Sequence, residues 1–237
     1  MDWKAIAELR KQGRRDELLA RLQDALRRDE IDPEELERAG RLLAKELGEP
    51  ATAVRVLGQC TTSWLSPMIA AIAWGSGLRL AVGDGGYDNV IQELTAHAPD
   101  VVVLLPWNDR LLGSDRPAEV RIADELAAWQ HAWSLAADRR ARVVQIGYDW
   151  LGAGPLGHHL SSEIAIVREL NHRLRDALPA GAYFVDLDAV SGQLGRARFY
   201  DPRQYHWTRQ PFSMAGAAAL ARHVVAGIRA LIAGPKK

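Results

Sequence analysis

Five short runs of β-branched and apolar residues alternate with amphipathic stretches from residue 51 to the end of the chain. The predicted strands are Val54–Leu57, Leu78–Val82, Val101–Leu105, Val143–Ile146 and Tyr183–Leu187. Helical spacing of apolar residues predicts helices over Trp64–Trp74, Asn89–His97, Pro117–Ala137, Ser161–Leu178 and Ser213–Ile232. This alternation is typical of βαβ units, so we expect an α/β fold: a three-layer α/β/α sandwich around a five-stranded parallel sheet.

The first 50 residues have a different sequence pattern: they are rich in charged residues, with Leu and Ala at helical spacing. They predict two or three short helices, the last beginning near Asp32 and Pro33, a capping residue and a first-turn proline. We therefore expect a helical N-terminal extension, residues 1–50, before an α/β domain, residues 51–237. The extension either packs on the domain or serves as a docking surface for a carrier protein or partner enzyme.

Charge and composition exclude several classes of function. Lys+Arg and Asp+Glu both number 30, so no net field attracts nucleic acid or an anionic membrane. The strand-like apolar runs are far shorter than a bilayer span, and the charged start lacks a signal-peptide core, which favours the cytoplasm. The one cysteine, Cys60, makes no internal disulfide, and no residue spacing predicts a metal site or a cofactor.

Ligands of open parallel sheets bind outside the carboxyl ends of the strands. Cys60 follows the first predicted strand by a few residues and precedes a helix. A thiol near a helix N-terminus has a lowered pKa, and the amides there can stabilise an oxyanion. The position therefore favours a nucleophile, although a lone cysteine is often only a small buried apolar residue.

Two further segments complete a possible active site. Asn108 and Asp109 follow the third strand, where an Asn amide can donate toward the nucleophile or the pair can form a simple turn. Asp201 and His206 lie in an aromatic-rich loop before the last helix, where a carboxylate can orient a basic imidazole, or the loop can be plain surface. Gly86, after the second strand, could offer a backbone oxyanion donor or only a tight turn.

These segments resemble, in order, the motifs of the SGNH or GDSL hydrolase superfamily. Gly58-Gln59-Cys60 matches the nucleophile block with Cys for Ser, and Asn108-Asp109 matches the Gly-x-Asn-Asp block with Pro106 in place of Gly. Asp201 and His206 resemble the Asp-x-x-His block with wider spacing, so Asp188 is a rival orienter. The resemblance implies Cys60 as nucleophile, His206 as base and Asp201 as its orienter, with Asn108 and Gly86 in the oxyanion hole.

The sequence is more closely similar to the SGNH-like amino-terminal region of FkbH-type proteins of polyketide pathways. The matching segments are Leu57–Leu65, Tyr87-Asp88, Phe199–Arg203 and Pro211–Ser213. In that family a phosphatase-like domain handles a phosphoglycerate, and the glyceryl group passes through an enzyme thioester to an acyl carrier protein. No Asp-x-Asp-x-Thr phosphatase motif occurs here, so the phosphoglycerate step is not implied for this chain.

We therefore predict an acyltransferase in which Cys60 carries a small acyl substrate as a thioester to or from the phosphopantetheine arm of an acyl carrier protein. Thr61, Trp107, Asp109 and Tyr205 are the predicted substrate-binding residues. One alternative is an SGNH-type thioesterase or esterase, which would release the acyl group to water. The other is an inactive SGNH-like interaction module, which predicts a buried and unreactive Cys60.

Overall fold

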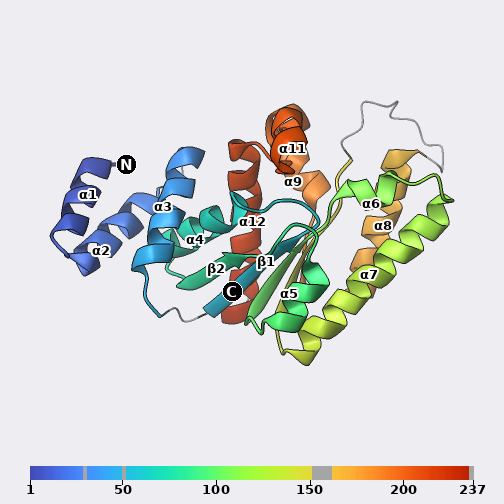
Figure 1. Ribbon diagram of the computed structural model, residues 1–237, viewed down its shortest axis with the longest axis horizontal. Coiled ribbons are helices and arrows are strands. Elements are labelled where there is room, and N and C mark those ends of the chain that lie inside the picture. Colours follow the sequence, from blue (N-terminus) through green and yellow to red (C-terminus); the bar gives the residue numbers. More distant parts are fainter. Residues whose placement is uncertain (29–30, 50–51, 151–161, 235–237) are drawn as a thin grey trace.

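The computed structural model describes residues 1–28, 31–49, 52–150 and 162–234. Its centre is one parallel sheet with the strand order β2-β1-β3-β4-β5. The strands are β1 Thr52–Gly58, β2 Leu80–Asp84, β3 Val101–Leu105, β4 Arg142–Ile146 and β5 Tyr183–Val185. The predicted α/β fold with a five-stranded parallel sheet is therefore confirmed (Figure 1).

Helices cover both faces of the sheet and make the three layers (Figure 1). α4 Leu65–Gly75 and α12 Met214–Ala233 pack together on one face, and α5 Val90–Ala96, α7 Ala118–Asp138 and α8 Glu163–Ala177 cover the other. The central strand β3 is buried along its whole length, and its side chains alternate between the two faces of the sheet. Val101, Val103 and Leu105 join the core beside α4 and α12, whereas Val102 and Leu104 join the core beside α7 and α8.

The N-terminal segment forms three helices, α1 Trp3–Lys11, α2 Arg15–Leu26 and α3 Pro33–Glu46. Asp32 caps α3 as predicted, because its side chain accepts a hydrogen bond from the Glu34 amide at 2.8 Å. The apolar faces of these helices belong to the same buried cluster as α4 and α12, with α3 lying directly on α4. Residues 50 and 51, where the sequence suggests a domain boundary, lie outside the described residues, and the two-part division stays a prediction.

The structure differs from the sequence-based prediction mainly after the strands. β5 ends at Val185, because Asp186 caps a helix, α9 Leu187–Leu194, that places Asp188 in a helix rather than at a strand end. A short helix, α6 Asn108–Leu112, occurs where Asn108 and Asp109 could have formed a simple turn, and a second short helix, α10 Arg196–Phe199, was not predicted. The expected loop around His206 is a helix, α11 Pro202–Thr208.

One described helix, α12, is long and apolar enough to cross a membrane by length and composition. Half of that apolar window is buried inside the fold, where α12 packs against α4, β4 and β5. Its apolar composition is therefore explained by its place in the core. The cellular compartment of the protein stays a prediction.

The contact between α3 and α4 depends on a glycine. A Cβ added to Gly40 would lie 1.8 Å from the carbonyl oxygen of Pro67, a backbone atom that cannot turn aside. Gly40→Ala should therefore lower the free energy of unfolding by about 2 kcal/mol. Gly192 in α9 is the matched control, since a Cβ added there would meet only open space, and Gly192→Ala should leave the protein equally or slightly more stable. Urea unfolding measures both, and equal effects of the two substitutions would contradict this packing.

Candidate active site

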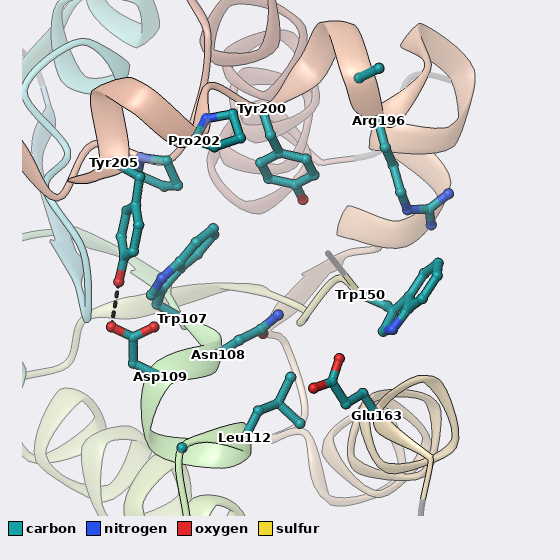
Figure 2. A pocket seen from close by; sticks show the side chains of 13 residues that line it. Trp107, Asn108, Asp109, Leu112, Trp150, Glu163, Arg196, Tyr200, Pro202 and Tyr205 are labelled. Atoms are coloured by element: carbon teal, nitrogen blue, oxygen red, sulfur yellow. Dashed lines mark hydrogen bonds between the residues drawn. The ribbon is translucent and has the colours of Figure 1, made fainter. Parts of the chain in front are cut away.

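A cavity of about 1090 Å³ opens at the carboxyl ends of β3 and β4. The loop and helix residues that follow these strands form one part of its wall, and residues of α10 and α11 form another (Figure 2). Its lining is mainly aromatic and apolar, with a few charged side chains: Trp107, Asn108, Asp109, Leu112, Gly113, Trp150, Glu163, Arg196, Ala197, Tyr200, Pro202, Tyr205 and Pro211. Its position and volume suit a bound organic substrate.

Cys60 lies at the same edge of the sheet but is not among the residues that line the cavity. The Gln59 amide donates to the Leu105 carbonyl at 3.0 Å and continues the β1–β3 pairing up to the cysteine. Thr61 then binds the end of α11: its amide donates to the Arg209 carbonyl at 2.9 Å and its hydroxyl to the Thr208 carbonyl at 2.7 Å. Cys60 is only 2% exposed beside this connection.

Burial sets the protonation state of this thiol. Loss of solvent raises the pKa of Cys60 far above its ordinary value, and the negative charge of Asp109 raises that pKa further. The expectation of a lowered pKa is therefore wrong for this conformation. The first residue of α4 is Leu65, so Cys60 lies outside the first turn of that helix, and desolvation dominates.

The structure does not bring Asp201 and His206 together as an orienter and a base. Asp201 caps α11, accepting from the amides of Arg203 at 3.1 Å and Gln204 at 3.0 Å. His206 is exposed, and its side chain makes no hydrogen bond with Asp201 or Cys60 in the described parts of the chain. The rival orienter Asp188 pairs instead with Arg196.

Both predicted oxyanion donors have other partners. The Asn108 side-chain amide donates to the Asp149 carbonyl at 2.5 Å, which leaves one amide hydrogen unused by that bond. The Gly86 carbonyl accepts from the Asn89 amide at 3.4 Å, and the Gly86 backbone contributes, after Arg55, to lowering the pKa of Glu93. These contacts place Gly86 at the start of α5.

Three of the four predicted substrate-binding residues do meet in the cavity wall. The Tyr205 hydroxyl donates to the Asp109 carboxylate, and the rings of Trp107 and Tyr205 lie 5.1 Å apart (Figure 2). Burial and the Asp109 hydrogen bond raise the pKa of the Tyr205 phenol, which keeps it a proton donor to that carboxylate. The fourth residue, Thr61, makes its contacts with α11 and is not part of the cavity lining.

The sequence analysis did not identify the buried carboxylate that binds Tyr200 and Arg196 of the cavity wall. Asp149, 2% exposed after β4, accepts from the Tyr200 hydroxyl at 2.7 Å, from Arg196 at 3.0 and 3.2 Å, and from the Ser191 hydroxyl. Its position directly after a predicted strand could have marked Asp149 as a candidate site residue. The pairing with Arg196 had none, because 47 residues separate the two in the chain.

A second buried network joins the strand ends beneath the cavity. The Gln59 side chain accepts from the Trp107 amide at 2.7 Å and donates to Glu125 at 3.2 Å. Glu125 also accepts from the Tyr148 hydroxyl at 2.6 Å. These contacts fix the ends of β1, β3 and β4 relative to one another. No cluster of His, Cys, Asp or Glu suited to a metal ion occurs among the described residues.

Comparisons with known proteins place the fold. The chain is similar to the N-terminal part of BF1531 from Bacteroides fragilis, a structure containing a phosphatase domain complexed with Mg, with 19% identity and a TM-score of 0.72. The match covers 85% of this chain and 57% of that one, so this chain spans little more than half of its length.

Smaller proteins match over nearly their whole length. TesA has 14% identity and a TM-score of 0.51 over 76% of this chain and 99% of its own. A mutant of Axe2, an acetyl-xylooligosaccharide esterase from Geobacillus, has 12% identity and a TM-score of 0.50, covering 76% and 94%. No protein-family model and no curated protein matches the sequence. At these identities the likeness establishes the fold alone: the chain shares its α/β architecture with TesA and Axe2.

Proposed function

We propose that this protein is an SGNH-type enzyme that cleaves or transfers an acyl ester or thioester, with Cys60 as its nucleophile. One observation carries the proposal: the only cysteine of the chain follows β1 at the edge of the sheet where the cavity opens, and the amide of Trp107 in the cavity wall donates to the side chain of the neighbouring Gln59 at 2.7 Å. The acyl group occupies that cavity. The likeness to the esterase Axe2 supports acyl chemistry on this fold.

The proposed reaction has two steps. His206 takes the proton of Cys60, the thiolate attacks the acyl carbonyl, the bond to the alcohol or thiol breaks, and His206 returns the proton to that leaving group. Water or a second thiol then gives a proton to His206 and attacks the thioester carbonyl, the bond to Cys60 breaks, and Cys60 takes the proton back from His206. The remaining amide hydrogen of Asn108 is the proposed donor to the oxyanion, with the Gly86 amide a further candidate after release from Glu93.

The buried thiol of Cys60 must become accessible to the substrate before it can react. The Thr61 contacts hold the end of α11 at the Cys60 loop, and the same helix carries Tyr205 and His206. A displacement of α11 uncovers the thiol and moves His206, the proposed base, in one step. Asp201 then contributes by holding the first turn of that helix, through its bonds to the α11 amides.

Transfer to the phosphopantetheine thiol of an acyl carrier protein is the finer form of the proposal. A thioester exchanges readily with another thiol, which suits a cysteine nucleophile to acyl transfer. The FkbH-type resemblance supports this acceptor, since those proteins join an SGNH-like region to a phosphatase-like domain. The matched BF1531 structure contains a phosphatase domain as well.

A non-catalytic interaction module is the second candidate, and it is favoured by the burial of Cys60 together with the exposure of His206. In that case the thiol is only a small apolar side chain of the core. This candidate and the enzyme make opposite predictions about covalent labelling.

Incubation of the protein with a panel of short acyl thioesters should give an acyl adduct, detected by intact mass spectrometry. The adduct should vanish in Cys60→Ala, which removes the nucleophile. Cys60→Ser is the matched control for packing, because it fills nearly the same space, and it should form adduct far more slowly than wild type. Adduct of equal yield on Cys60→Ala, or none on wild type, would exclude the covalent mechanism.

The fate of that adduct separates transfer from hydrolysis. Loss to a carrier's phosphopantetheine thiol that is much faster than loss to water indicates a transferase. Equal rates with and without carrier indicate a thioesterase, in agreement with the SGNH alternative.

The charge of Asp109 predicts a pH effect. Since this carboxylate raises the pKa of Cys60, Asp109→Asn should lower that pKa and shift the pH midpoint of iodoacetamide labelling downward. The remaining desolvation keeps the midpoint above that of a free thiol. Asp88→Asn serves as control, because Asp88 pairs with Arg110 at 3.8 Å and does not affect the thiol pKa. An unchanged midpoint in Asp109→Asn would contradict the proximity of the two groups.

A further inference from the structure

The charges around the cavity do not balance. Its lining contains two carboxylates, Asp109 and Glu163, and a single cation, Arg196, among the described residues. Arg196 is already shared between two further carboxylates, Asp149 and Asp188. Two carboxylates outside the lining already neutralise the positive charge of Arg196. The negative charges of Asp109 and Glu163 are therefore left in excess in the cavity.

The two lining carboxylates differ in how they are partnered. Asp109 accepts from Tyr205, and the largely exposed Arg209 reaches it only at 4.0 Å. The Glu163 carboxylate makes no hydrogen bond or ion pair with any described residue. Glu163 is thus the carboxylate of the wall that is free to pair with a ligand.

Aromatic rings supply the second feature of a cation site. Trp107, Tyr200 and Tyr205 form one wall, with the Trp107 ring 6.2 Å from Tyr200 and 5.1 Å from Tyr205. Trp150 lies on the side of Glu163, away from Tyr205 and Asp109 (Figure 2). Ring faces attract cations, so an aromatic wall together with the unpaired carboxylate of Glu163 favours a positively charged group.

Glu163 also has a purely structural explanation. It is the first residue of α8, where a carboxylate is stabilised by the helix dipole. That explanation accounts for a glutamate at this position but predicts no preference for a charged ligand. A measured preference for cationic ligands therefore distinguishes a binding role of Glu163 from a purely structural one.

We propose that the acyl group taken by this cavity carries an amino group. The inference rests on the proposed acyl chemistry and names its substrate class: an aminoacyl ester or thioester. The ammonium lies between Glu163 and Trp150 (Figure 2). The carbonyl lies at the opposite end, beside Asp109 and Trp107, where the Trp107 amide donates to the side chain of Gln59, the residue before Cys60. The same charges make acyl groups that carry a carboxylate or phosphate bind more weakly.

Three unreactive amides of equal chain length test this preference without any turnover: δ-aminovaleramide, valeramide and glutaramate, which are cationic, neutral and anionic. Calorimetric titration of the full chain should show the cationic amide binding about tenfold more tightly than the neutral one. The anionic amide should bind most weakly, and the order should persist in Cys60→Ala.

Glu163→Gln should remove the preference for the amine while leaving the affinity for valeramide unchanged. Glu169→Gln is the matched control on the same helix, because Glu169 pairs with Arg173 outside the cavity, and it should keep the preference. Equal binding of the three amides, no binding of any, or an amine preference that survives Glu163→Gln would overturn the inference. Because the amides do not acylate, these results stand apart from the covalent labelling of Cys60.

Discussion

Two hydrogen bonds from Thr61 join the end of α11 to the loop of the proposed nucleophile. They hold the Thr208 and Arg209 carbonyls beside Cys60, which is itself buried in the core cluster. A thiol without solvent or a cationic partner keeps its proton, and the nearby Asp109 carboxylate adds to that effect. In the proposed enzyme, the position of Cys60 therefore favours nucleophilic chemistry and its protonation opposes that chemistry.

The cavity and the covered thiol are parts of one arrangement. Tyr205, in the middle of α11, donates to Asp109 in the cavity wall, while the end of the same helix covers the cysteine loop. A ligand that competes for Asp109 therefore acts on the helix that also restrains the thiol. The buried Asp149 and Glu125 networks tie together the residues that follow β4 and those of the neighbouring elements, so we expect the displacement to be confined to the α11 side.

The sequence predicted the sheet well because period-two and helical patterns are local properties, as in β3 and the long helix α7. It also located Cys60 and Asn108 at the correct strand ends, since topology alone brings those ends to one edge. It missed α11, because a seven-residue segment rich in polar and aromatic residues has no helical periodicity to detect. The partners of Asn108 and Arg196 depend on tertiary packing, which no spacing in the sequence encodes.

The central claim is that Cys60 reacts through a local opening of α11, and the urea dependence of its iodoacetamide labelling tests this directly. Local opening exposes little surface, so we expect a labelling rate that is nearly independent of low urea concentrations. Thr61→Val, which removes the hydroxyl bond to Thr208, should raise that rate. A rate that rises with urea as steeply as global unfolding does, and that Thr61→Val changes only as far as it changes global stability, would contradict the account and leave Cys60 a residue of the core.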